Sequence, residues 1–152
     1  METLERIIAE HPFLADLDPA FTSLMVGCAS NVRFNRGEYI FRDGDPANAF
    51  YLIREGQVAV EIFAPQRKPI IVATLDEGDI LGWSWLLPPY QWKLNARAIE
   101  NVRAFALDGK CLRAKCEENH DLGYEVLKRF ARIIEQRLEA TRLQLIDVYA
   151  AR

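Results

Sequence analysis

The sequence predicts a mainly β domain, an antiparallel β-roll of the double-stranded jelly-roll kind, with helices before it and one long helix after it. From Val32 onward, apolar residues recur with a period of two. Turns containing glycine or proline separate these runs at spacings near ten residues, which is typical of antiparallel sandwiches and rolls. We therefore expect a single domain over residues 1–152, with N-terminal helices in 1–30, the roll in 31–107 and C-terminal helices in 108–152.

The first thirty residues carry helical periodicity interrupted by two X-Pro steps, so we expect two or three short helices. Asp18 is a candidate N-cap, because Pro19 follows it at the first helical position. His11 precedes Pro12 and is interpreted as an ordinary loop residue.

Seven runs are expected to form strands, because they are short, rich in β-branched and aromatic residues, and bounded by turn residues. They are residues 32–34, 39–41, 50–53, 58–62, 70–75, 94–100 and 102–107.

After the roll, Asp108 is expected to cap a short helix over 110–118, and a long helix is expected from about residue 121. The apolar residues of the long helix recur at spacings of three, four or seven and are interpreted as a single stripe. They are Leu122, Val126, Phe130, Ile133, Ile134, Leu138, Leu145 and Val148. About 27 residues at 1.5 Å each give a rod of about 40 Å, longer than a small roll needs. The alternative is a helix packed wholly on its own roll.

The most distinctive stretch runs from Leu75 to Ala98 and contains all three tryptophans, Trp83, Trp85 and Trp92. We expect a strand end, one helical turn stopped by Pro88-Pro89, a loop and a strand. Gly82 would stand just before the helical turn, where a residue without Cβ lets a ligand approach exposed backbone N–H groups. Such a site favours an anion.

Residues 78–98 of this stretch resemble the phosphate-binding cassette of cyclic nucleotide-binding domains. The resemblance to that family extends over about residues 20–148. The upstream residues that follow the family pattern are Phe34, Gly37, Ile40, Gly44, Asp45, Tyr51, Ile53, Gly56, Val58 and Val60. The cassette keeps Gly82 and the pair Leu86-Leu87. The resemblance implies a regulatory module that binds a cyclic nucleotide and dimerises through its last helix.

The cassette departs from the family at two positions. Trp83 stands where the family has a glutamate for the ribose hydroxyl, and Trp92 where it has the arginine for the cyclic phosphate. A hydrogen bond to a charged group contributes about 1.5–3 kcal/mol, so losing both subtracts about 3–6 kcal/mol, or two to four powers of ten in affinity. The candidate ligand-binding residues are Ile80, Leu81, Gly82, Trp83, Ser84, Trp85, Trp92 and Lys93.

Three interpretations of this site stay open. Lys93, or a basic side chain from the long helix, would compensate for the lost arginine, although Lys93 faces away from Trp92 unless the strand bulges near Pro88. The tryptophans would otherwise form an aromatic pocket for a planar or apolar ligand. They would equally well be core residues that fill the roll.

Composition narrows the function classes. The net charge of −3 gives no general attraction to nucleic acid or anionic membrane, and no apolar run is long enough to span a bilayer. The start of the chain lacks a basic region followed by an apolar run, so we expect a cytoplasmic protein without a membrane segment. Direct DNA binding is not expected, because acidic residues interrupt the basic residues of the long helix and no residues follow to build a helix-turn-helix domain.

Cysteines and histidines are few. Cys28, Cys111 and Cys116 are an odd number, which favours free thiols in a reducing cytosol over a disulfide framework. Cys111, Cys116 and His120 make a poor metal set, because Cys111 lies about 140° around a helix from Cys116. With two histidines outside the strands and no nucleophile paired with a base, we do not expect an enzyme.

The function predicted from the sequence is a regulatory module that senses a small ligand through a degenerate pocket and signals to a separate protein partner. The ligand would be a weakly bound cyclic nucleotide, cAMP or cGMP, or another small planar or apolar molecule. The alternative is a ligandless interaction domain that acts through a helical homodimer surface.

Overall fold

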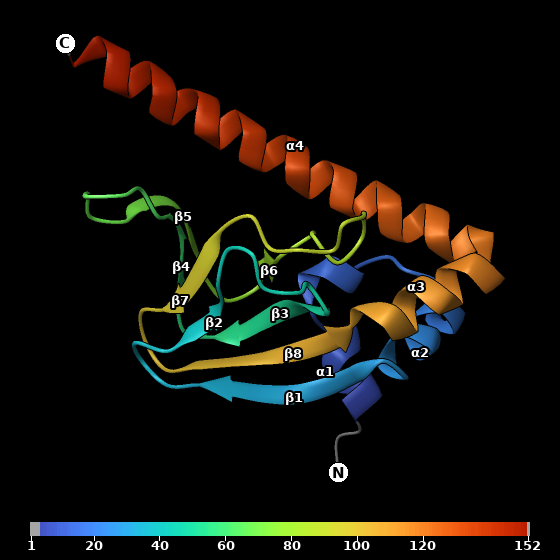
Figure 1. The fold of residues 1–152 in the computed structure, drawn as a ribbon. Helices are drawn as coiled ribbons and strands as arrows, with labels where there is room; N and C mark the ends of the chain where they lie inside the picture. Colours follow the sequence, from blue (N-terminus) through green and yellow to red (C-terminus); the bar gives the residue numbers. More distant parts are fainter. Residues whose placement is uncertain (1–3, 152) are drawn as a thin grey trace.

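The computed structural model describes residues 4–151 and contains the predicted roll between two groups of helices (Figure 1). The helices are α1 (Leu4–Ala9), η1 (Pro12–Leu14, a 3-10 turn), α2 (Pro19–Val26), α3 (Gly109–Glu118) and α4 (His120–Ala150). The strands are β1 (Ala29–Phe34), β2 (Tyr39–Phe41), β3 (Ala49–Glu55), β4 (Val58–Ile62), β5 (Ile70–Leu75), β6 (Ile80–Leu81), β7 (Asn95–Ala98) and β8 (Val102–Asp108).

Two antiparallel four-stranded sheets form the roll, with strand orders β1-β8-β3-β6 and β2-β7-β4-β5. Every predicted strand is present, which confirms the predicted fold class. Burial alternates along β7, where Ala96 and Ala98 are buried while Asn95 and Arg97 are half-buried. The two-residue strand β6 lies at a sheet edge and leads directly into the tryptophan-rich stretch.

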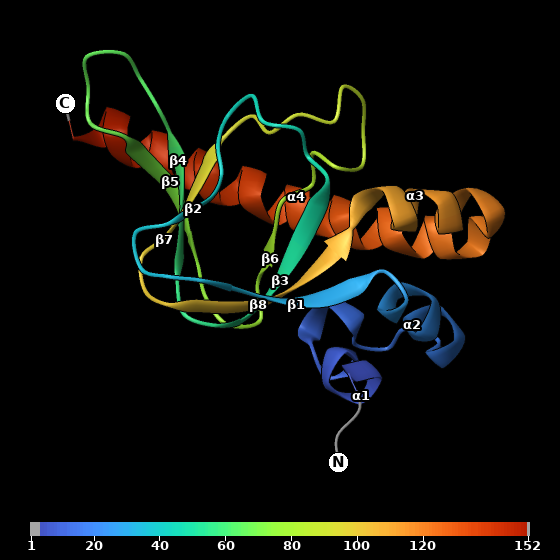
Figure 2. The same ribbon diagram turned by 60° about the horizontal axis from the view of Figure 1, so that its bottom comes forward.

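The N-terminal helices pack beneath the roll (Figure 2). Asp18 caps α2 as predicted, because its carboxylate accepts the backbone N–H of Ala20 at 2.9 Å. His11 lies at a bend before Pro12, as interpreted, but it is buried and bonded to distant backbone, which the sequence did not show. The residue is 7% exposed. Its Nδ1 accepts the N–H of Phe13 at 3.2 Å, and Nε2 lies 3.2 Å from the carbonyl oxygen of Ile53. His11 therefore ties η1 to β3.

The prediction of three free thiols was also wrong. Cys28, directly before β1, and Cys111, in the first turn of α3, form a disulfide across a sequence separation of 83 residues. The odd cysteine count was misleading because it does not show which two sulfurs the fold brings together, and here a Cα–Cα distance of 5.7 Å suits a bridge. Cys116 stays a free, half-buried thiol.

Asp108 caps α3 as predicted, by accepting the N–H of Cys111 at 2.8 Å. Asn119 then caps α4, accepting the N–H of Leu122 at 3.1 Å. The predicted single apolar stripe of α4 is in fact two rows. Leu122, Val126 and Phe130 are buried against the domain, whereas the row from Ile134 to Val148 is exposed.

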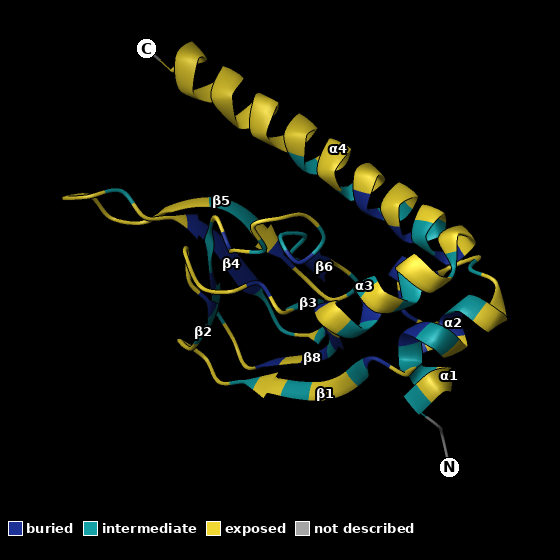
Figure 3. Cartoon of the chain, turned by 45° about the vertical axis from the view of Figure 1, so that its right-hand side comes forward, coloured by how far each residue is buried: buried dark blue, intermediate teal, exposed yellow. Residues whose placement is uncertain are grey.

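Figure 3 shows this change along α4, whose first turns meet the domain and whose last turns project beyond it. All residues from Leu138 to Ala150 are exposed. None of the helices within residues 4–151 combines the length and hydropathy that crossing a bilayer requires.

The tryptophan-rich stretch differs from prediction at one point. No helix forms between Gly82 and Gln91; residues 84–89 are turns and bends. The N–H of Leu86 donates to the carbonyl of Trp83 at 3.1 Å, but Pro88 and Pro89 have no N–H groups with which to extend the turn. The expected helix N-terminus beside Gly82, and the anion preference that it implied, are therefore missing.

Candidate functional site

The ligand site predicted around Gly82 lies where β6 ends, and the indole of Trp92 occupies it. We call this space, between Gly82 and Phe41, the slot. Gly82 has a φ of +94°, which favours glycine, and a Cβ added there would lie 2.5 Å from the indole ring of Trp92. The glycine that would let a ligand approach the backbone therefore lets an indole approach it instead.

Trp92 is firmly held in this position. Its ring stacks on Phe41 of β2, with ring centroids 3.7 Å apart and planes 5° from parallel, and the residue is 4% exposed. The expected alternation of faces holds, since Trp92, Ala96 and Ala98 are buried while Lys93 is exposed. Lys93 therefore lies at the rim of the slot and does not replace the missing arginine in its interior.

A small hollow remains beside the indole. Its volume is about 100 Å³, compared with about 300–1,000 Å³ for typical ligand pockets. The residues that line it are Phe41, Val60, Leu81, Gly82, Trp83, Ser84, Trp92, Lys93, Leu94 and Arg137. The structure thus gathers most of the predicted site residues at one hollow, with Ile80 buried beside them in β6.

Arg137 of α4 is a second cation at this hollow, beside Lys93. The sequence pointed to a basic side chain of the long helix without singling out Arg137. Its guanidinium lies 5.1 Å from the ring centroid of Trp83 and donates a hydrogen bond to the carbonyl oxygen of Ile80. Burial lowers the pKa of Arg137, and the nearby Asp79 carboxylate opposes that shift. One signal was available: Arg137 continues the inward row of Phe130 and Ile133, where a charged residue is unexpected.

Trp85 does not line the hollow. It is fully buried among Phe50 and Phe130, with ring-centroid distances of 4.9 and 5.4 Å, and its Nε1 has no hydrogen-bond partner among the described residues. The three tryptophans therefore divide into one that fills the slot, one that packs on Arg137 and one that belongs to the core under α4.

A second, larger concavity separates α4 from β5. Its volume is about 610 Å³, and three arginines of α4, Arg129, Arg132 and Arg137, line it together with the Asp79 carboxylate. Arg129 already has two partners, because it donates to the carbonyl of Phe13 at 2.7 Å and lies 4.0 Å from the Glu125 carboxylate. It is therefore less available to a ligand than Arg132. Val72, Ile80 and Ile133 contribute apolar surface. This groove is larger than the hollow beside Trp92 and, like it, carries more positive than negative charge.

Metal chemistry finds no support in the described part of the chain. Residues 4–151 contain no cluster of three or more histidine, cysteine, aspartate or glutamate side chains that could hold an ion. The set weighed from the sequence is broken, because the sulfur of Cys111 is bonded to that of Cys28.

Known proteins share this fold. Residues 31–119 match the family model described as the cyclic nucleotide-binding domain. A protein of Geobacter metallireducens GS-15, whose name assigns it cyclic nucleotide binding, has a solved structure with a TM-score of 0.79 and 26% identity, covering 90% of this chain and 99% of that one. A cyclic nucleotide-binding domain from Methylobacillus flagellatus kt, 18% identical, superposes with a TM-score of 0.78 over 88% of this chain and 75% of that one.

Two curated relatives are regulators. A CRP-like cAMP-activated global transcriptional regulator of Mycobacterium tuberculosis is 23% identical over 95% of this chain, and the match spans 63% of the regulator's length. A cAMP-dependent protein kinase regulatory subunit of Emericella nidulans is 30% identical over 68% of this chain and 24% of its own. The chain thus has the fold of regulatory sensor domains, and with more than half of its residues matched to the family model it belongs to the cyclic nucleotide-binding domain family.

Proposed function

We propose that this chain is a regulatory module in which the side chain of Trp92 occupies the space that a cyclic nucleotide would occupy. The module would act on other proteins through α4 and would not catalyse a reaction. The observation that carries the proposal is the indole of Trp92 stacked on Phe41 and packed over Gly82. A ligand would have to break this stack and then bury a phosphate that Trp92, a neutral donor, does not balance.

The same geometry explains how α4 stays docked without a ligand. Arg137 reaches from α4 to the Ile80 carbonyl and the Trp83 ring. Trp83, which stands at the family's glutamate position, thus helps to hold the helix on the roll. We infer that the helix is held constitutively in the position seen here.

A pair of variants tests the slot. Titration of wild-type protein with cAMP or cGMP, followed by intrinsic fluorescence and thermal shift, should give no saturable response at millimolar nucleotide, because the slot is filled. The W83E/W92R variant restores a carboxylate and a guanidinium to the two family positions and should bind at least tenfold more tightly. W85F is the matched control, because Trp85 lies outside the slot. Micromolar binding by wild-type protein would contradict the proposal.

We further propose that a second copy of this chain covers the exposed row of α4. Alternating spacings of four and three residues connect its members, the heptad pattern of a two-stranded coiled coil. They are Leu127, Ala131, Ile134, Leu138, Thr141, Leu145 and Val148. Leu138 and Leu145 are 51% and 55% exposed, and a self-complementary seam of this kind is what a parallel homodimer buries. A separate protein partner would then meet the dimer.

The groove between α4 and β5 favours a second candidate function, the sensing of an anionic ligand away from the slot. Its arginines would meet the negative charge, and its apolar surface would meet a planar ring. Because Arg137 contacts Trp83, a ligand that draws on Arg137 should change tryptophan emission.

ATP is a suitable probe for the groove, since it combines a planar base with a polyanion. A saturable fluorescence change that R132Q weakens at least fivefold and W92R leaves unchanged would support the groove. A flat titration, or an effect of W92R equal to that of R132Q, would exclude this second function.

A further inference from the structure

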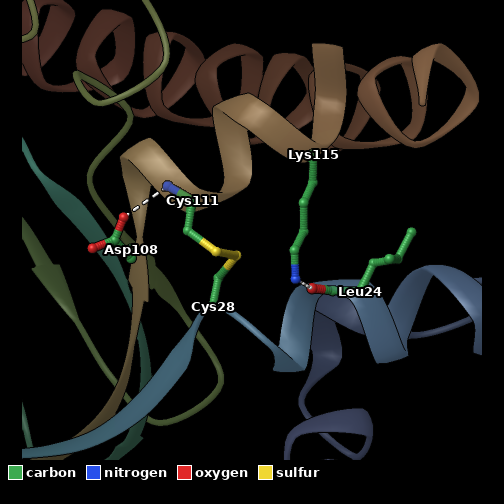
Figure 4. Close-up of a disulfide and its surroundings, with 5 residues drawn as sticks. All are labelled: Leu24, Cys28, Asp108, Cys111 and Lys115. Atoms are coloured by element: carbon green, nitrogen blue, oxygen red, sulfur yellow. Dashed lines mark hydrogen bonds between the residues drawn. A yellow bond between two sulfur atoms is a disulfide. The ribbon is translucent and has the colours of Figure 1, made fainter. Parts of the chain in front are cut away.

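The Cys28–Cys111 disulfide fastens α3, the helix that leads into α4, to the start of β1 (Figure 4). Cys28 is 7% exposed, whereas Cys111 is half-buried and is the third residue of α3. The bridge therefore joins the segment between α2 and β1 to α3, and α3 leads directly into α4. We call this the joint.

Non-covalent bonds hold the same joint. The N–H of Asp108 donates to the carbonyl of Cys28 at 2.8 Å, and the Lys115 ammonium donates to the carbonyl of Leu24 at 2.7 Å. Strands β1 and β8 pair immediately beside the bridge, with Ala29 opposite Leu107. With the sulfur–sulfur bond broken, these contacts would keep the two thiols close enough for the bond to form again.

The bridge is also within reach of a small thiol. An open hollow of about 620 Å³ lies beside it, and Cys28, Cys111, Lys110 and Asp108 are among the residues that line it. Two charged side chains flank the bridge at this hollow: the Lys110 ammonium and the Asp108 carboxylate, which accepts the Cys111 N–H at 2.8 Å. A tripeptide thiol such as glutathione is small enough for this hollow, and the Lys110 ammonium can pair with one of its carboxylates.

We propose that Cys28 and Cys111 form a reversible thiol–disulfide exchange site that sets how firmly α3 and the base of α4 are attached to the roll. In oxidation, the Cys111 thiolate attacks glutathione disulfide, forms a mixed disulfide and releases one glutathione thiolate. Cys28 then attacks the Cys111 sulfur, the mixed disulfide breaks and the second glutathione leaves. Two electrons pass from the protein dithiol to glutathione disulfide, and the two thiol protons end on two glutathione molecules. Reduction follows the same steps backward.

Cys116 provides an internal contrast. It lies on α3 five residues after Cys111, but burial, followed by the charge of Glu117, raises the pKa of its thiol. A thiol with a raised pKa is a poor nucleophile at neutral pH. Exchange is therefore assigned to the Cys28–Cys111 pair, and Cys116 is the matched control.

Equilibration of the folded protein in glutathione buffers of increasing reducing power, followed by alkylation and mass spectrometry, tests the proposal. C116S protein, which keeps only the pair, should pass from the bridged to the doubly alkylated form below the denaturation temperature and return on transfer to an oxidising buffer. A pair that stays bridged in the most reducing buffer, or opens only with denaturant, would be a structural crosslink, and the proposal would be wrong.

Hydrogen exchange of the same samples tests the consequence for attachment. In the dithiol form, the amides of α3 and of residues 24–30 should exchange at least tenfold faster, while those of β3 should change much less. The melting temperature should fall by roughly 10 °C, since reduction opens a loop of this length. Equal exchange in both redox forms would contradict the proposed control of attachment. Because these measurements use wild-type cysteines at positions 28 and 111, they do not depend on whether C28S/C111S protein folds.

Discussion

The two halves of α4 belong to one continuous helix, yet their surroundings are opposite. In the first half, Phe130 is fully buried against Phe13, Phe50 and Trp85, with ring centroids 5.1–5.4 Å away. In the second half, every residue from Leu138 to Ala150 is exposed, although Leu143, Leu145 and others are as apolar as those in the core. The difference shows that the apolar residues of this helix serve two purposes, namely docking to the roll and forming an outer surface.

Arg137 marks the boundary between the halves. The inward row continues past it with Gln144, whose amide donates to the carbonyl of Val72 in β5 at 3.2 Å. Beyond Ile133, then, α4 contacts its own roll through polar side chains that bind backbone carbonyls, and the apolar side chains turn outward. The apolar part of the inward face therefore ends at Ile133, before Arg137.

The largest effect is expected in the first half. F130A should lower the free energy of unfolding by about 3–5 kcal/mol, because it leaves a cavity among three aromatic rings. L143A, in the exposed half, should change the unfolding free energy of the isolated domain by less than about 0.5 kcal/mol. Urea denaturation of both variants at concentrations that favour monomers measures this contrast. Equal losses would mean that the second half also packs on the domain.

A smaller effect is expected at the boundary. R137Q removes the hydrogen bond to Ile80 and the contact with Trp83, and should cost about 2 kcal/mol. It should also shift tryptophan emission, because the guanidinium no longer lies over the Trp83 ring. R142Q is the control, since Arg142 pairs with the exposed Glu139 at 3.5 Å, and such surface pairs contribute about 0–1 kcal/mol. Unchanged emission and stability in R137Q would show that the arginine does not fasten α4.

The smallest effect is expected at η1, which packs against the first half of α4. His11 holds η1, whose Phe13 packs on Phe130, and burial lowers the pKa of His11, opposed by its bond to Ile53 and by Asp79. Because the folded state binds the proton less readily than the unfolded state, the neutral imidazole contributes its full stability above about pH 6.5. That stability is lost as the pH falls through the lower folded pKa.

The melting temperature should therefore decrease between neutral pH and pH 5 by more in wild-type protein than in H11N. The side-chain amide introduced by this substitution would still accept the Phe13 N–H through its carbonyl oxygen, but it would not titrate. Parallel pH dependences for the two proteins would rule out His11 as the titrating group.

The sequence alone sufficed for features that depend on local chemistry. The caps at Asp18 and Asp108 follow from residues two or three positions away, and the strands follow from a period of two. Trp83 and Trp92 were recognised as departures because the residues around them keep the family spacing.

Features that depend on distant parts of the chain were not predictable in this way. The Arg137 bond to Ile80 spans 57 residues, and the Cys28–Cys111 bridge spans 83. The His11 contact with Ile53 spans 42. Each joins a helical segment to a strand, or to the residue before one, far away in the sequence, so no periodicity or turn signal encodes it. The stacking of Trp92 on Phe41 was missed for the same reason, since the two residues lie far apart in the sequence and meet only when β2 pairs with β7.

Sedimentation equilibrium on wild-type protein and on an L138S/L145S/V148S variant tests most directly whether the second half of α4 is the working surface. The three serines replace exposed apolar residues, so the monomer should keep its circular dichroism spectrum. We expect wild-type protein to sediment as a dimer and the variant as a monomer. A wild-type monomer at all concentrations, or a dimer unaffected by the three substitutions, would contradict the account.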